Sequence, residues 1–282
     1  MAWISRQFPT RVIALMPVAI AINIVLGALV QQALKLPIYL DSIGTILVGV
    51  LAGPLAGALT GILANLIWGY LLPAPIGTTT IGPFAITAGV IGLLAGLWGY
   101  LGWFRSRRGD VGRNLLPAAV ALVLVAALAF YTYSRAYASS QNFQNTTGFD
   151  PAFIARSQAF FLLVMVVFVA LIAWALFLRR DLGAVFALAA GLVTGIVAAI
   201  VSAPIAAVVF GGVTGSGTDA LVAAFRAAGS SLYEATLKQG LLSDPLDKMV
   251  TSFVVFIIVT SLSRRYVARF PNGERLVGTE ET

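Results

Sequence analysis

One stretch of the chain repeats glycine at every fourth residue: Gly49, Gly53, Gly57 and Gly61. A four-residue step keeps these positions on one stripe of a helix, where no side chain holds a neighbouring backbone away. In water, each interior glycine would cost about 1 kcal/mol relative to alanine, so such a helix needs close packing to form. The stripe therefore predicts helix-packing residues inside a membrane bundle. Because Pro54 suits the first turn of a helix, Gly53-Pro54 predicts a break between helices at 41–52 and 54–71.

The composition is that of an integral membrane protein. Hydrophobic residues make up 59% of the 282-residue chain, charged residues only 10%, and the mean hydropathy is +0.94. Crossing about 30 Å of hydrocarbon takes about 20 apolar residues in a helix. Besides the helix pair at 41–71, segments of that kind lie at 10–31, 83–104, 115–134, 157–178, 183–211 and 247–263. We therefore expect an all-α bundle of about eight transmembrane segments in a single membrane domain, 1–282.

The basic residues predict the orientation of this bundle. With a cytoplasmic N-terminus and 41–71 as a helical pair, the cytoplasmic side holds 12 of 18 basic residues and 5 of 11 acids. These basic residues are Arg6, Arg11, Arg105, Arg107, Arg108, Arg113, Arg179, Arg180, Arg264, Arg265, Arg269 and Arg275. The outer side then holds equal numbers of basic and acidic residues. Since cytoplasmic loops are rich in Lys and Arg, both termini are predicted to be cytoplasmic.

Several classes of function find no support in the sequence. The chain has no cysteine and no histidine, which excludes disulfides, imidazole acid-base chemistry and Cys or His metal sites. The Gly-rich run 211–219 has no lysine and does not match a phosphate-binding loop. The acids are scattered, and Asp244 and Asp247 are interpreted as a helix-start signal before Lys248. We therefore expect neither an enzyme nor a nucleic-acid-binding protein, and no cofactor.

Polar and aromatic residues form a predicted ring near the outer mouth of the bundle. The candidate substrate-binding residues are Tyr39, Asp41, Asn65, Trp68, Thr80, Glu234, Asp247 and Lys248. For Asn65, which continues the glycine stripe, an interhelical hydrogen bond and a substrate contact are equally compatible with the pattern. Two long outer loops flank the mouth, 135–156 and 212–246, the second with amphipathic helices broken at Gly229. With no unpaired acid expected deep in the membrane, the ligand is predicted to be a neutral, zwitterionic or weakly anionic heterocycle.

Several of these motifs together resemble the substrate-binding S components of energy-coupling factor (ECF) transporters. The matching motifs are Asp-Ser-Ile-Gly-Thr-Ile at 41–46, Ala-Gly-Pro-Leu-Ala-Gly at 52–57, Asn-Leu at 65–66, Val-Ser-Ala-Pro-Ile at 201–205 and Asp-Pro-Leu-Asp-Lys at 244–248. The resemblance covers about two thirds of the chain. It implies a multi-pass subunit of a bacterial cytoplasmic membrane that binds a vitamin-like solute from outside. Its implied partners are a coupling membrane subunit and two cytoplasmic ATPases.

The chain departs from the family pattern in two ways. The family core has six helices, so 105–182 is interpreted as an inserted transmembrane hairpin between core helices 1–4 (1–104) and the last core helices (183–264, with the outer loop 212–246). The remainder, 265–282, is a predicted cytoplasmic tail. The family's small-residue docking patch on the first helix corresponds here to Ala19, Asn23 and Gly27. A self-sufficient secondary transporter is the alternative, for which inverted repeats and midplane ion sites are expected.

Overall fold

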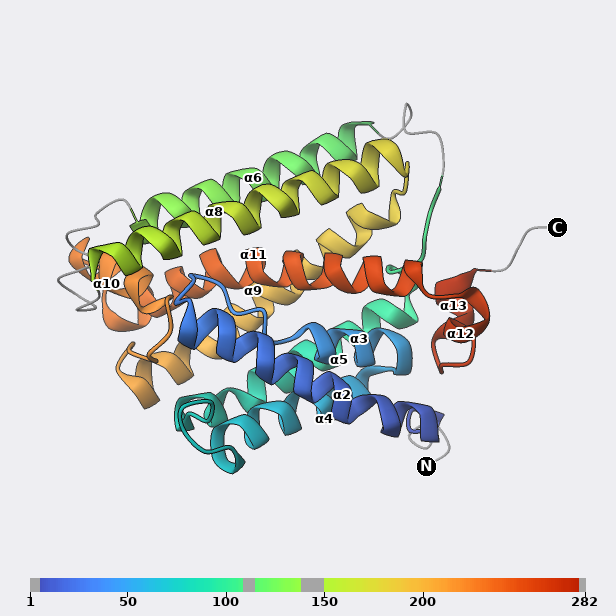
Figure 1. The fold of residues 1–282 in the computed structure, drawn as a ribbon, viewed down its shortest axis with the longest axis horizontal. Helices are drawn as coiled ribbons and strands as arrows, with labels where there is room; N and C mark the ends of the chain where they lie inside the picture. The colour runs from blue at the N-terminus through green and yellow to red at the C-terminus, as the bar shows by residue number, and fades with distance from the viewer. Residues whose placement is uncertain (1–5, 109–114, 138–149, 279–282) are drawn as a thin grey trace.

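The computed structural model describes residues 6–108, 115–137 and 150–278, and Figure 1 shows their arrangement. Of the predicted cytoplasmic cluster, Arg6 is inside these ranges and Arg113 is outside them. The described residues are 79% helical and contain no strand. Six helical stretches are long and apolar enough to cross a membrane: Thr10–Ala33, Pro54–Leu71, Thr79–Tyr100, Leu116–Tyr137, Pro151–Leu178 and Gly183–Phe210. The chain is thus a helical, multi-pass membrane protein.

The helices follow in a simple order along the chain. The first half contains α2 (Thr10–Gly27, extended by η1, Ala28–Ala33), α3 (Ile43–Ala52), α4 (Pro54–Leu66, extended by η2, Ile67–Leu71), η3 (Thr79–Phe84) and α5 (Ala85–Tyr100). The second half contains α6 (Leu115–Tyr137), α8 (Pro151–Ala173, extended by η5, Trp174–Leu178), α9 (Gly183–Phe210), α10 (Asp219–Ala227), α11 (Leu232–Ser261), α12 (Arg264–Val267) and α13 (Gly273–Val277).

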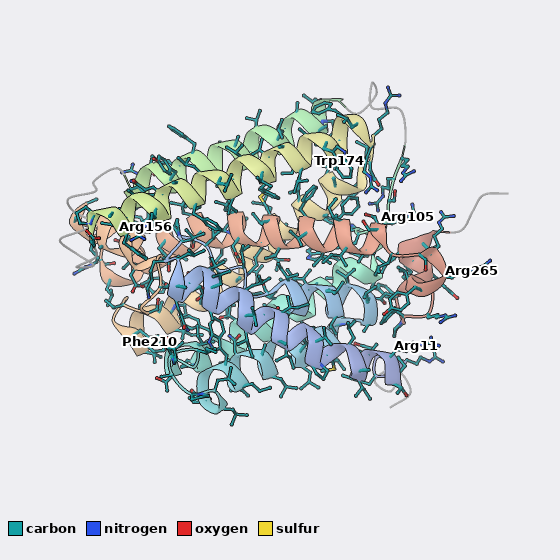
Figure 2. All side chains as sticks on the ribbon, in the orientation of Figure 1. Arg11, Arg105, Arg156, Trp174, Phe210 and Arg265 are labelled. Carbon is teal, nitrogen blue, oxygen red and sulfur yellow. The ribbon has the colours of Figure 1, made fainter. Side chains whose placement is uncertain are left out.

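These helices form three groups that lie side by side. In Figure 1, the α6–α8 hairpin lies on one side, α2 to α5 on the other, and α9 with α11 between them. Phe168 of α8 packs edge-on against Phe253 of α11, with ring centroids 5.6 Å apart. The start of α2 and the helices α12 and α13 lie at one end, as Figure 2 shows for Arg11, Arg105 and Arg265, whereas Phe210 lies at the other. We call these the arginine end and the loop end.

The predicted break at Gly53-Pro54 is confirmed. α3 ends at Ala52, Gly53 adopts φ +120°, which favours glycine, and α4 begins at Pro54. Gln7, which is buried, accepts a hydrogen bond of 2.9 Å from the backbone N–H of Leu55 and so caps α4. α3 and α4 are therefore two separate helices joined at Gly53, as the sequence predicts.

The glycine stripe lies where α3 and α4 meet α5. A Cβ on Gly57 would lie 2.5 Å from the Gly92 carbonyl oxygen, and one on Gly61 would lie 2.5 Å from the Ala88 carbonyl oxygen. A Cβ on Gly49 would meet the same turn of α5, at 2.9 Å from the Gly92 oxygen. The backbones are thus in direct contact, which brings α5 close to α4 along its length.

The predicted last segment, 247–263, begins too late. α11 starts fifteen residues earlier, at Leu232, and its 30 residues span about 45 Å. The start is fixed by a capping box, in which Ser231 accepts from the Glu234 backbone N–H and Glu234 accepts from the Ser231 backbone N–H. The predicted break at Gly229 is present, with φ +90°, but the second outer helix continues into the bundle.

The glycine contact predicts different outcomes for two neighbouring substitutions on α5. A Cβ on Gly92 would lie 2.2 Å from the Gly57 backbone, whereas one on Gly89 would meet only the flexible Ile62 side chain, at 3.0 Å. We expect Gly92→Ala to lower the free energy of unfolding by about 1–3 kcal/mol, since backbones must separate. Gly89→Ala should be neutral or stabilising, since alanine is the better helix former. Thermal unfolding in detergent measures both, and equal melting temperatures would contradict the packing account.

Candidate functional site

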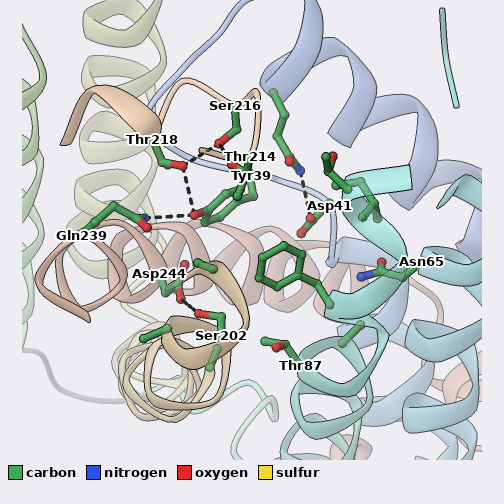
Figure 3. A pocket seen from close by; sticks show the side chains of 18 of the residues that line it. Tyr39, Asp41, Asn65, Thr87, Ser202, Thr214, Ser216, Thr218, Gln239 and Asp244 are labelled. Atoms are coloured by element: carbon green, nitrogen blue, oxygen red, sulfur yellow. Dashed lines mark hydrogen bonds between the residues drawn. The ribbon is translucent and has the colours of Figure 1, made fainter. Parts of the chain in front are cut away.

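A cavity of about 90 Å³ lies between the two halves of the bundle towards the loop end. Figure 3 shows it from close by. It is lined by Gln31, Tyr39, Asp41, Ser42, Asn65, Thr80, Ile81, Phe84, Thr87, Ala88, Ile91, Ala198, Ser202, Ala203, Ala206, Gly212, Thr214, Ser216, Thr218, Asp219, Val222, Gln239, Asp244 and Lys248. Its volume holds several water molecules or a small organic solute. The lining combines apolar side chains of α5 and α9 with polar groups from two loops and α11.

Asp247 holds the segment 34–42 over this cavity. Its side chain is fully buried on α11, and Oδ1 accepts hydrogen bonds from the backbone N–H groups of Tyr39 (3.0 Å) and Leu40 (2.7 Å). Its other oxygen, Oδ2, lies 2.5 Å from Lys248 Nζ. One carboxylate therefore joins residues about two hundred positions apart, and it satisfies two backbone donors that no helix pairs.

Lys248 is the centre of a buried charge cluster. Besides Asp247, Nζ donates to Ser42 Oγ at 2.8 Å and lies 3.6 Å from Asp41 Oδ1. Asp41 in turn accepts a hydrogen bond of 2.9 Å from Gln31 Nε2. The lysine is only 3% exposed, so its charge depends on these carboxylates for compensation.

This cluster lies deeper than the sequence predicts. Gly191 and Gly195 of α9 contact the backbone of Lys248 and Pro245, which places the charges beside the middle of Gly183–Phe210. The interpretation of Asp244 and Asp247 as a helix start is wrong, since the capping box lies at Ser231. The true signal, Ser-x-x-Glu at 231–234, was available in the sequence.

Asp244 is a site residue that the sequence analysis missed. Its side chain lines the cavity and is 4% exposed, and its Oδ2 accepts one long hydrogen bond, 3.4 Å, from Ser202 Oγ. Among the described residues, no lysine or arginine lies within ion-pair distance of it. The premise that no unpaired acid lies deep in the bundle is therefore wrong.

Two further polar groups face the cavity without a partner. Asn65 is 7% exposed, and within the described ranges its amide makes no hydrogen bond to the protein. Thr87 also lines the cavity, and its Oγ1 is buried and has no hydrogen-bond partner in the described part of the chain. For Asn65, the structure thus favours the cavity contact over the interhelical hydrogen bond. An amide and a hydroxyl left unpaired in a buried site are available to a ligand.

A second loop closes the cavity at the loop end. Tyr39 Oη lies 3.3 Å from Thr218 Oγ1 and accepts a hydrogen bond of 3.0 Å from Gln239 Nε2. Lys35 Nζ donates to the Gly215 carbonyl oxygen, which ties the two loops together. Asp219 shapes this loop by accepting from the backbone N–H groups of Thr214 and Gly215, while burial raises the pKa of its carboxyl.

Of the eight predicted substrate-binding residues, the structure brings Tyr39, Asp41, Asn65, Thr80 and Lys248 to the cavity wall, with Asp247 behind them. Trp68 does not reach the cavity. It is 1% exposed, packs over Gly27 and donates from Nε1 to the Ile76 carbonyl oxygen at 2.7 Å. Glu234 is exposed and caps α11. Its carboxylate accepts from Ser231, and hydrogen bonding from Ser231 lowers the pKa of Glu234. The structure thus places both residues away from the cavity: Trp68 bonds to a loop carbonyl oxygen, and Glu234 caps its own helix.

The predicted docking patch also needs correction. Ala19, Asn23 and Gly27 are buried within the chain. Asn23 donates to Thr45 Oγ1 at 2.8 Å and accepts from the Gly44 backbone N–H at 2.7 Å, so it fastens α2 to α3. Ala19 lies against Gly44 of α3 in the same contact. This face is therefore not free to meet another subunit.

Comparison with known proteins gives no relative: no protein-family model matches the chain, and neither the curated proteins nor the solved structures contain a match. Within the described residues, no group of three or more Asp or Glu side chains is placed to hold a metal ion.

The charge cluster predicts a large cost for removing its cation. Lys248→Met leaves the fully buried Asp247 and the partly buried Asp41 without compensation, so we expect a loss of about 3–5 kcal/mol in the free energy of unfolding. Lys238→Met is the matched control, since Lys238 is exposed on the same helix. Thermal unfolding in detergent compares them, and a loss for Lys248→Met no greater than for the control would contradict the cluster's role.

Proposed function

We propose that this chain is the substrate-binding S component of an ECF-type importer. It captures a small vitamin-like solute in the cavity at the loop end. A coupling membrane subunit and two ATPases then drive the uptake of this solute. The observation that carries the proposal is the cavity itself, which two loops cover and where, among the described residues, Asn65 and Thr87 have no hydrogen-bond partner. Pockets of this kind, mostly apolar with a few placed polar groups, are typical of small-molecule sites. The sequence motifs that resemble S components, at 41–46, 65–66, 201–205 and 244–248, supply residues on or beside its wall.

The proposed topology has eight crossings with both termini in the cytoplasm. Six of the crossings are the candidate spans. The seventh is α11, and the eighth is formed by the segment 34–42 and the short α3 that follows it. The arginine end is then cytoplasmic, in accord with the preference of Lys and Arg for that side. The cavity opens towards the outside, in a bacterial cytoplasmic membrane.

Single cysteines test this orientation, because the native chain has none. Ala228 is exposed at the loop end between α10 and α11, and Ala268 is exposed at the arginine end after α12. We expect a membrane-impermeant maleimide to label Ala228→Cys in intact cells and Ala268→Cys only after permeabilisation. Labelling of both from the same side would overturn the eight-crossing topology.

A secondary transporter is the second candidate, and one observation favours it. The buried residues Asp244, Asp247 and Lys248, with the partly buried Asp41, lie beside the middle of α9, and carriers bind substrates and coupling ions near the middle of the membrane. Such a protein would need no ATPase. The two proposals therefore differ in what drives accumulation.

Uptake of a labelled vitamin panel separates these functions. We expect cells to accumulate a substrate only when the chain and an ECF coupling module are expressed together, and to lose uptake when the Walker lysines of the ATPases are replaced. The module expressed without the chain is the control for other substrate-binding subunits. Accumulation by the chain alone that collapses with a protonophore would instead establish the secondary transporter.

A further inference from the structure

We propose that the cavity selects a small organic cation, a protonated amine whose ammonium group pairs with Asp244. This inference rests on the proposed function and names the substrate class of its site. It replaces the neutral, zwitterionic or weakly anionic heterocycle expected from the sequence, since that expectation depended on the absence of a deep unpaired acid.

The charges around the cavity leave one carboxylate without compensation. In the part of the chain that the structure describes, Lys248 is the one cation within ion-pair distance of these acids, and it pairs with Asp247 at 2.5 Å and Asp41 at 3.6 Å. Asp244 has only the Ser202 hydroxyl, at 3.4 Å, and its Oδ1 has no partner among the described residues. The one lysine of this group thus pairs with two carboxyl groups, and the third, that of Asp244, lies outside ion-pair distance of it. A ligand that brings a positive charge offsets this imbalance, whereas an anion increases it.

The surroundings of Asp244 suit an organic ammonium better than a metal ion. Ser202 Oγ is the oxygen that contacts its carboxyl group, and within the described residues no group of three or more Asp or Glu side chains is placed to hold a metal ion. Tyr39 and Phe84 add aromatic rings to the wall. Aromatic faces attract organic cations, and Tyr39 already has a lysine ammonium 6.0 Å from its ring centroid.

The opposite wall defines the other end of the ligand. Figure 3 shows Asp244 and Ser202 on one side of the cavity and Asn65 on the other. Asn65 offers both a donor and an acceptor, and Thr87 adds a hydroxyl. Phe84, Ile91 and Ala198 add apolar surface to the lining of the same cavity. We therefore expect a ligand with an ammonium at one end, a flat or apolar middle, and an uncharged hydrogen-bonding group at the other.

Matched pairs of probes test this charge preference on the full chain in detergent. Pyridoxamine and pyridoxine, and tryptamine and tryptophol, each differ by an amine in place of a hydroxyl. Isothermal titration gives the affinity of each probe for the parent, for Asp244→Asn, for Asn65→Ala and for Glu274→Gln, an exposed acid at the arginine end. Asp244→Asn keeps the size of the side chain and removes its charge.

We expect the amine of at least one pair to bind the parent more tightly than its alcohol. Asp244→Asn should lower the affinity for the amine roughly thirtyfold or more, as loss of a buried ion-pair partner does, and should change the affinity for the alcohol little. Asn65→Ala should lower the affinity for both members of the pair alike, and Glu274→Gln should lower neither affinity. Thermal unfolding of each variant shows that it is folded.

Two outcomes would overturn the inference. One is that alcohols bind as well as amines, or that Asp244→Asn retains amine affinity; the site then binds small solutes, so the proposed function stands without the charge preference. The other is that no amine binds while the uptake assay identifies a neutral or anionic substrate. Failure of uptake with the coupling module, combined with Asp244-dependent amine binding, would instead remove the proposed function and keep the cation site.

Discussion

The hydrogen bonds of Asp247 are the contact on which the site depends. This buried carboxylate of α11 accepts from the backbone of Tyr39 and Leu40 and pairs with Lys248, so the segment 34–42 is fixed across the loop end of the bundle. Tyr39 then reaches Thr218 and Gln239, which joins the second loop to the same closure. Without this carboxylate, two backbone donors would lose their partner and the buried ammonium would lose one of its two paired carboxylates, each at a cost of desolvation. These contacts together hold both loops over the cavity.

Small residues make room for that polar centre. Gly191 and Gly195 let α9 contact the backbone of α11 at Lys248 and Pro245, and Gly57 and Gly61 of α4 contact the backbone of α5 at Gly92 and Ala88. Close backbone contact compensates for the weak driving force between apolar helices in lipid. The same contacts leave few alternatives for the positions of the site's side chains, which favours a preformed pocket.

The sequence predicts the fold better than the site, for identifiable reasons. The break at Gly53-Pro54 and the existence of the hairpin follow from local rules for proline, glycine and apolar length, and the structure agrees with them. Asp244 was missed and Glu234 misplaced because both depend on where α11 begins, and acids near position 244 imitate a helix start. Trp68 and Asn23 were misassigned because a side chain at a helix end can face the bundle, the lipid or the neighbouring helix. Only the tertiary contacts distinguish these, and short-range patterns do not contain them.

Residue-resolved hydrogen exchange tests the central claim, that Asp247 holds the segment 34–42 closed over the cavity. In the full chain, we predict that the amides of Tyr39 and Leu40 exchange much more slowly than those of the exposed segment 73–78, which has only one backbone hydrogen bond of its own, Gly77 to Pro73. Asp247→Ala should raise their exchange to that of 73–78 while leaving α4 and α5 protected. Equal, fast exchange of both segments in the parent protein would contradict the account.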